Sequence, residues 1–174
     1  QTNSFAVTNG DEATAKKHAI ELADRFWKHH KKMQVPLTSL EDAVRLAATV
    51  SSGTVVMMDA ADATSSGASG DSNAILREAI RQDYRGRILT PIVDPVAVEK
   101  AFAAGVGSTI CMTVGGALDS ARYLPLEVEA RVRSLADGKF RSESFGWQWD
   151  SGNTAVLETG NATLVVGTNP VSLF

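Results

Sequence analysis

The sequence predicts an α/β fold, with a mainly parallel sheet and flanking helices in residues 1–115 and an antiparallel β meander in residues 116–174. A change of hydrophobic period near residue 116 supports this division. Before it, apolar runs alternate with amphipathic helical segments, as is typical of parallel strands joined by right-handed crossovers. After it, apolar and charged residues alternate one by one, which is typical of strands with one face in water. We expect both parts to share one core as a single domain.

The first forty residues predict one short strand and two helices. Residues 4–7 are apolar enough for a strand, and a long helix follows with Asn9 as its cap. In this helix apolar residues recur at steps of three and four, and cations crowd the last turns, which suits a helix carboxyl end. Pro36 marks a break, and residues 38–41 form a capping box that begins a second helix.

The central residues predict a repeating order of strand, turn and helix. The apolar run at residues 54–58 predicts a buried strand. Asp94 directly before a proline predicts a capped helix start, and Gly105 predicts its end because glycine readily adopts left-handed dihedral angles. The other expected elements are a helix over about residues 72–84 and inner strands over residues 87–93 and 106–114.

The second part predicts several short antiparallel strands. One has a buried and a wet face, formed respectively by Leu126, Val128, Ala130 and Val132 and by Glu127, Glu129, Arg131 and Arg133. Asp137 and Gly138 indicate a hairpin turn, and further strands are expected near residues 155–157 and 164–166. Trp147 and Trp149 share one face of a strand, where they either pack on the sheet or floor a binding site.

The loop of residues 59–71 is the candidate site, because it is rich in Gly and Ser and lies between an apolar run and an amphipathic helix. The candidate cleft residues are Asp59, Asp62, Gly67, Gly70, Asp71 and Asp94. A carboxylate pair such as Asp59 and Asp62 suits general acid and base chemistry or a hard cation. The structural alternative is that Asp71 caps the next helix while the glycines give the backbone freedom.

The sequence contains no complete zinc or serine-hydrolase motif. His29 and His30 are adjacent, so they point about 100° apart on a helix and are expected on the solvated surface, like His18. The single cysteine, Cys111, excludes an internal disulfide and is expected to be a small buried side chain. The loop lacks the lysine of a phosphate-binding P-loop, and Asp71 would repel phosphate there.

Charge and hydropathy exclude two classes of partner. The net charge is −3 and the basic residues are dispersed, so no electrostatic footprint for nucleic acid is present. No apolar run approaches the roughly 18 residues of a membrane span, and no signal-peptide pattern opens the sequence. We therefore expect a cytoplasmic protein that binds neither nucleic acid nor a membrane.

Both ends of the sequence suggest a piece of a longer polypeptide. The first residue is Gln1 rather than Met, and apolar residues follow almost at once. The last residues, 171–174, are also mostly apolar. Because such ends are usually found inside structure, we expect a further domain in the parent protein.

Several short motifs, in order and spacing, resemble the C-terminal domain of the MlrC (microcystinase C) family of metallopeptidase-like proteins over nearly the whole chain. The residues that carry the resemblance are Asp59, Asp62, Gly67, Ala68, Gly70, Asp71, Asp94, Pro95, Ala97, Val98, Ala101, Ala104, Gly105, Val106, Gly107, Gly115, Gly116, Pro125, Leu126, Asp137 and Gly138. One departure concerns residues 63–67, where the family usually has Asn-Pro-Gly-Gly-Gly and this chain has Ala-Thr-Ser-Ser-Gly.

The resemblance implies a zinc-dependent hydrolase that acts on small or unusual peptides. It places the metal ligands in an N-terminal domain of the same polypeptide, so no zinc is expected on this chain alone. It also places the 59–71 loop near the cleft between the two domains and leaves a homo-oligomer open. The alternative is a non-catalytic α/β domain whose role is packing, oligomerisation or binding of a small ligand in the same loop.

Overall fold

The computed structural model describes residues 2–171, and the chain forms two units, residues 1–38 and residues 39–174. We call them unit 1 and unit 2. Gln1 and residues 172–174 lie outside the described residues. No helix among residues 2–171 has the length and hydropathy needed to cross a membrane.

Unit 1 consists of an extended segment, the helix α1 (Glu12–His29) and the 3-10 turn η1 (His30–Met33). The expected strand at residues 4–7 does not form, and among residues 2–171 no strand pairs with this segment. Ser4 Oγ instead donates to the carbonyl of Ala19, 2.8 Å away. The cap is Asp11 rather than Asn9, because the Asp11 carboxylate reaches the N–H of Thr14 at 3.0 Å. The helix and its basic last turn are confirmed.

Unit 2 begins with α2 (Leu40–Ala48), which starts where the capping box predicts. Ser39 is the N-cap, and its Oγ accepts from the N–H of Asp42 at 3.1 Å. The later helices of this unit are η2 (Thr64–Ser66), α3 (Ala74–Arg81) and α4 (Pro95–Ala104). Asp94 caps α4 and Gly105 ends it at φ +81°, so both predictions made for this helix are confirmed.

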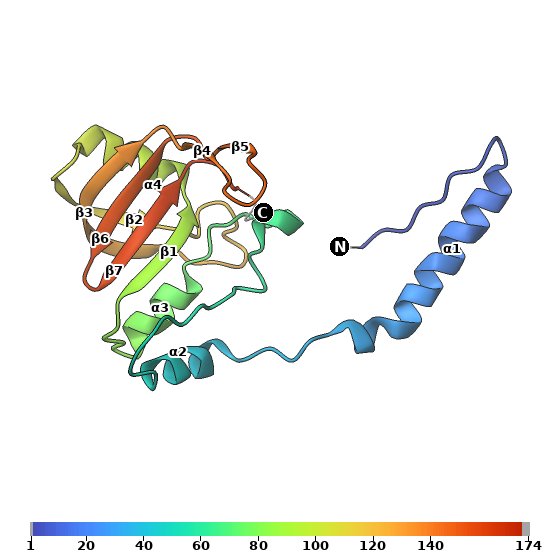
Figure 1. The fold of residues 1–174 in the computed structure, drawn as a ribbon, viewed down its shortest axis with the longest axis horizontal. Coiled ribbons are helices and arrows are strands. Elements are labelled where there is room, and N and C mark those ends of the chain that lie inside the picture. The colour runs from blue at the N-terminus through green and yellow to red at the C-terminus, as the bar shows by residue number, and fades with distance from the viewer. Residues whose placement is uncertain (1, 172–174) are drawn as a thin grey trace. The chain divides into compact units, whose positions relative to one another are not determined.

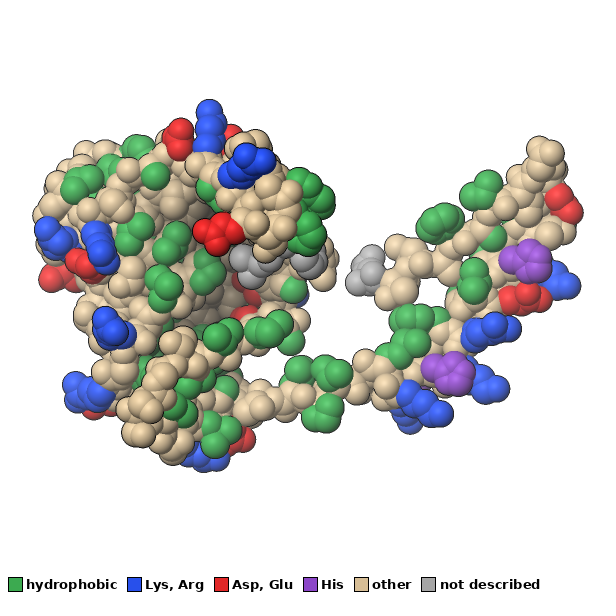
Figure 2. Space-filling view, in the orientation of Figure 1, with side chains coloured by type: hydrophobic (Ala, Val, Ile, Leu, Met, Phe, Trp, Pro, Cys, Tyr) green, Lys and Arg blue, Asp and Glu red, His purple; other side chains and the backbone are tan. Residues whose placement is uncertain are grey.

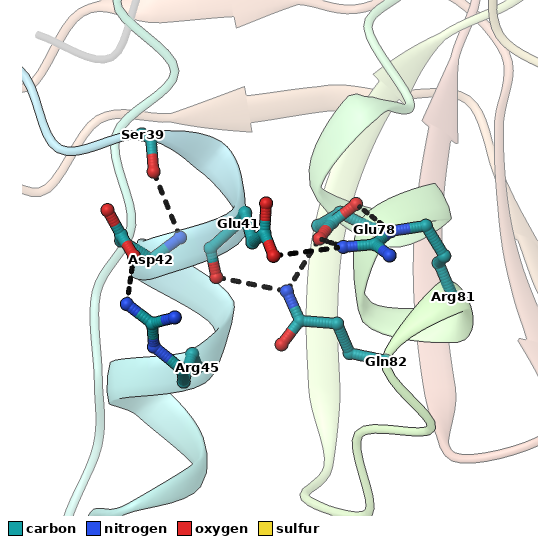
Figure 3. A network of polar contacts seen from close by, with 7 residues as sticks. All are labelled: Ser39, Glu41, Asp42, Arg45, Glu78, Arg81 and Gln82. Carbon is teal, nitrogen blue, oxygen red and sulfur yellow. Dashed lines mark hydrogen bonds and ion pairs between the residues drawn. The ribbon is translucent and has the colours of Figure 1, made fainter.

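Polar side chains join α2 to α3 (Figure 3). Gln82 Nε2 donates to the carbonyl of Glu41 at 2.9 Å, and the Arg81 guanidinium lies 3.7 Å from the Glu41 carboxylate. Arg81 also donates two hydrogen bonds to Glu78, at 2.7 and 2.8 Å. These bonds, with one from Gln82, lower the pKa of Glu78 to about 2. The contact fixes α2 against the helix that follows the candidate loop.

The main sheet has five strands in the order β1-β7-β6-β3-β2, and a second sheet pairs β4 with β5 (Figure 1). The strands are β1 (Ile88–Val93), β2 (Thr109–Val114), β3 (Leu126–Ala136), β4 (Lys139–Arg141), β5 (Gln148–Asp150), β6 (Thr154–Thr159) and β7 (Ala162–Gly167). The α/β class with flanking helices and an antiparallel second part is confirmed. The parallel contribution is one pair, β1 with β7, and the other pairings are antiparallel.

The core lies between one face of this sheet and the helices. The helix α4 packs across β2, β3, β6 and β7. The predicted alternation along β3 is confirmed, because its apolar side chains from Val128 to Val132 are buried while the charged ones between them are exposed. Residues with no exposed surface in this core include Ala101, Val114, Ala130, Val132, Ala155, Leu157, Leu164 and Val166.

Three sequence predictions about the strands of unit 2 and their faces are wrong. Residues 54–58 are not a strand, and Val56 and Met58 are 80% and 89% exposed. Asp137 and Gly138 do not close a hairpin between neighbours, because β3 pairs with β6 while β4 pairs with β5. Cys111 is exposed, since β2 turns its neighbour Met112 to the core and Cys111 to the opposite face.

The two tryptophans of the second sheet differ in exposure. Trp147 is 57% exposed and stacks on Phe145, with ring centroids 5.0 Å apart. Trp149 on β5 is half-buried opposite Phe140 of β4. Neither indole lines a described cavity, so packing is the role that the structure supports.

Candidate functional site

The 59–71 loop is attached to the carboxyl end of the parallel pair. The N–H of Val93, the last residue of β1, donates to the carbonyl of Gly70 at 2.8 Å. The next residue, Asp94, donates its N–H to the carbonyl of Gly167 at the end of β7, at 2.9 Å. Ligand sites of α/β proteins collect at this edge of a sheet, because the loops there vary without disturbing the core.

Asp62 and Asp59 organise the loop around them. The two Asp62 oxygens accept from the N–H of Gly70 at 2.8 Å and the N–H of Ser72 at 2.7 Å. Asp59 accepts from Ser72 Oγ at 2.8 Å and from the N–H of Ala61 at 2.9 Å. Both carboxylates thus fold the chain back on itself, and both also line the cavity described below.

Asp71 does not cap α3, which corrects the structural alternative given for it. The N-cap position is Asn73, and Asp71 has no exposed surface. Its carboxylate instead accepts from the N–H of Leu118 at 2.7 Å, the N–H of Asp119 at 3.0 Å and Ser69 Oγ at 2.5 Å. Burial acts to raise the pKa of Asp71, but these hydrogen bonds outweigh it and hold the pKa below its ordinary value.

Asp94 joins the helix start to a glycine pair. One oxygen accepts from the N–H of Ala97 at 2.9 Å and the other from the N–H of Gly115 at 2.8 Å. Gly115 has φ +68°, and a Cβ there would lie 2.6 Å from the Asp71 carbonyl oxygen. Only glycine fits at this position, because any side chain would meet backbone that cannot move away.

The two loop glycines have different surroundings. Gly67 ends η2 at φ +84° and faces open space. Gly70 has φ +77°, and a Cβ there would lie 2.7 Å from methyl groups of both Thr64 and Val93. Gly70 is therefore required where the loop meets β1, whereas Gly67 serves the local turn.

Two further groups at this site, Asn73 and Tyr123, have no signal in the sequence. Asn73 is 3% exposed and its Nδ2 donates to the carbonyls of Val114 and Leu124, each at 2.8 Å. Tyr123 is 8% exposed, and its hydroxyl donates to the carbonyl of Ala61 at 3.3 Å. Burial raises the pKa of the Tyr123 hydroxyl, and the negative charges of Asp62 and Asp59 raise it further. The hydrogen-bond partners of both side chains lie more than 40 residues away in the sequence, so no local pattern predicts these contacts.

A cavity of about 880 Å³ opens beside the loop, within the size range of small-molecule sites. Of the six sequence candidates, Asp59, Asp62 and Gly70 line it, whereas Gly67, Asp71 and Asp94 do not. Most other lining side chains are apolar, among them Val56, Met57, Met58, Ile75, Pro91, Phe140 and Val165. Figure 2 shows hydrophobic side chains on and around a hollowed part of this face of unit 2.

The described residues do not form a metal site. Among residues 2–171, no group of three His, Cys, Asp or Glu side chains is close enough to hold a metal ion. The histidines His18, His29 and His30 lie in unit 1. The carboxylates of the loop are held by backbone and hydroxyl donors of this chain, so a zinc ion does not fit them as they stand.

The comparisons with known proteins agree with the family resemblance seen in the sequence. The family model described as "MlrC C-terminus" matches residues 57–174. The chain belongs to this family. It is 32% identical to microcystinase C from Sphingomonas sp. over 132 residues, which are 75% of this chain and 26% of that protein.

A solved structure is similar in fold. The crystal structure of a metallopeptidase-like protein from Mesorhizobium sp. BNC1 matches with a TM-score of 0.76 and 31% identity. The match covers 89% of this chain and 32% of that one. The chain of this MlrC-family domain thus spans about a quarter to a third of the length of these relatives.

Proposed function

We propose that this chain is the C-terminal domain of a zinc-dependent, peptidase-like hydrolase that acts on small or unusual peptides in the cytoplasm. The observation that carries the proposal is the cavity beside the 59–71 loop, at the carboxyl end of the β1/β7 pair. The family and the metallopeptidase-like relative support the class of reaction. In this proposal the metal and its ligands belong to an N-terminal domain of the same polypeptide, and the cavity faces the cleft between the two.

The residues of this chain shape the site rather than perform the reaction. Asp59 and Asp62 hold the loop in its folded course, and Gly70 keeps it close to β1. Their removal would move the cavity wall without touching the metal. We therefore assign them as positioning residues for peptide binding, and we assign no catalytic residue to this chain.

The test compares this chain with the full-length parent. Bound zinc and hydrolysis of small peptides are measured for both, side by side. We expect zinc and turnover in the parent only, with the Asp62→Ala parent losing about tenfold in kcat/KM, chiefly through KM, while its zinc content is unchanged. Glu129→Ala, at an exposed carboxylate of β3 that lines neither cavity, is the matched control. Tight zinc with turnover in this chain alone would contradict the proposal.

A second candidate is a non-catalytic domain that packs, oligomerises or binds a small ligand in the same loop. It is favoured by one observation, which is that Asp59, Asp62 and Asp71 all satisfy donors of the chain itself. A parent that binds no metal and hydrolyses no peptide would favour this candidate.

A further inference from the structure

We propose that a groove along the free edge of β1 binds a peptide segment in extended conformation, with an apolar side chain of that segment in the larger cavity. The inference deepens the proposed function and rests on it for the choice of a peptide as the ligand. It names the part of the peptide that this domain recognises: an extended stretch of about six residues, apolar and without acidic side chains.

Two cavities form the groove. The second has a volume of about 570 Å³ and lies between residues 50–57 and β1. Five residues, Val56, Met57, Ile75, Thr90 and Pro91, line both cavities, so the two lie side by side. Together they follow β1 over its whole length, which at the usual rise per residue is about 20 Å. This length suits an extended peptide of about six residues.

The strand β1 is at the edge of the sheet, and its outer backbone groups are only partly used. The N–H of Ile88 donates inward to the carbonyl of Asn161, and the N–H of Val93 donates outward to Gly70. Since backbone direction alternates along a strand, the N–H and C=O of Leu89 point outward, and within residues 2–171 neither has a hydrogen-bond partner. An extended peptide can satisfy both, as in strand addition to a sheet edge.

The same edge cannot support a permanent additional strand. Pro91 has no N–H, and the outward N–H of Val93 is already bonded to the loop. A full ladder is therefore blocked, and the backbone bonds available to a visiting segment centre on Leu89. This favours a ligand that binds and leaves over a segment of the same polypeptide that stays in place.

The walls of the groove select an apolar and non-acidic ligand. Val56 and Leu89 are 80% and 73% exposed at its two sides. Met57 and Met58 line the larger cavity with flexible, polarisable side chains that adapt to different shapes. The charged residues that line the two cavities are three carboxylates, Asp59, Asp62 and Asp137, and two cations, Lys139 and Arg87, so the balance is negative and an acidic peptide is disfavoured.

The test uses this whole chain without metal and two fluorescein-labelled probes, acetyl-Ala-Phe-Ala-Leu-Ala-Lys-amide and the same peptide with Glu in place of Phe and Leu. Binding is followed by fluorescence anisotropy, and the amide resonance of Leu89 by NMR. We expect saturable binding of the apolar probe, at least about tenfold tighter than the acidic one, with a shift at Leu89. N-methylation of the central alanine of the apolar probe removes a backbone N–H donor and should weaken binding of this probe about fivefold.

Matched surface variants locate the site. Val56→Asp and Leu89→Asp should weaken binding of the apolar probe about tenfold, whereas Val106→Asp, at a 62% exposed valine outside the groove, should change it less than about twofold. Circular dichroism confirms that each variant is folded. Absence of saturable binding, or equal losses in all three variants, would overturn the proposal.

The outcome is separable from that of the proposed function. Peptide binding is measured here without zinc or a second domain, whereas turnover is measured on the parent. A parent that hydrolyses peptides while this chain binds neither probe would refute the groove alone. A parent without turnover, beside a chain that binds the apolar probe at Leu89, would refute the hydrolase and leave the groove as a peptide-binding site.

Discussion

The turns at Asp71 and Asp94 look alike in the sequence, because each aspartate stands shortly before an amphipathic helix. In the structure, Asp94 caps its helix through the N–H of Ala97, three residues away. Asp71 instead bonds the N–H groups of Leu118 and Asp119, 47 and 48 residues away. The difference shows that a buried carboxylate accepts hydrogen bonds from whichever buried donors lack another partner. The sequence around the aspartate predicts those donors only when they lie nearby in the chain.

Of the changes at these two turns, loss of the Asp71 carboxylate should lower the stability of the fold most. Asp71→Ala leaves two backbone N–H groups and one hydroxyl without their acceptor at a buried position. We expect the free energy of unfolding to fall by about 4 kcal/mol, which urea denaturation measures. A loss of about 1 kcal/mol, as for an ordinary helix cap, would show that the remote bonds contribute little.

The glycine that connects the two turns provides the next test. Gly115→Ala places a Cβ 2.6 Å from the Asp71 carbonyl oxygen at φ +68°, so we expect a loss of about 3 kcal/mol. The matched control is Gly67→Ala, in the left-handed helical region at φ +84° and with nothing within 4 Å, which should lose about 1 kcal/mol. Equal midpoints of thermal unfolding for the two variants would contradict the close approach.

Loss of the Asp94 carboxylate should cost less than loss of Asp71. Asp94→Ala removes a local cap and the acceptor for Gly115 N–H, so we expect a loss of about 2 kcal/mol. Asp94→Asn keeps one acceptor oxygen and should recover about half of the lost free energy of unfolding. Urea denaturation of both variants and of Asp71→Ala compares their losses in free energy of unfolding. A larger loss for Asp94→Ala than for Asp71→Ala would contradict the expected order.

The smallest effect concerns the exposed network between α2 and α3. Glu78 has a pKa of about 2 in the folded chain because Arg81 and Gln82 hydrogen-bond to it, against an ordinary value of 4.5. A folded pKa below the unfolded one means that its contribution to stability is present above pH 4.5 and is lost as the pH falls through about 2. NMR titration should show this pKa, and Arg81→Ala should return it toward 4.5; an unchanged pKa would contradict the assignment.

Local signals were sufficient for much of the fold. The start of a helix at residues 38–41, the cap at Asp94, the end of α4 at Gly105 and the faces of β3 were all predicted, because each depends on residues within a few positions. The strands β6 and β7 were also expected, from apolar residues between turn signals.

The features that the sequence did not predict depend on distant parts of the chain. Residues 54–58 have strand-like composition, but at the outer edge of β1 no strand pairs with them. The parallel partner of β1 is β7, more than seventy residues further on, so the pairing that positions the cavity has no local signal. The same holds for the side chains of Asp71 and Asn73, whose backbone partners lie beyond residue 113.

The position of β7 between β1 and β6 has a consequence for biosynthesis. During translation β1 emerges long before β7, and until β7 has left the ribosome β1 has no neighbour on which to form its ladder. The loop that is bonded to the end of β1 must wait as well. Closure of the sheet is therefore a late, long-range step, which leaves the apolar segment β1 of the nascent chain unpaired and prone to aggregation until β7 is made.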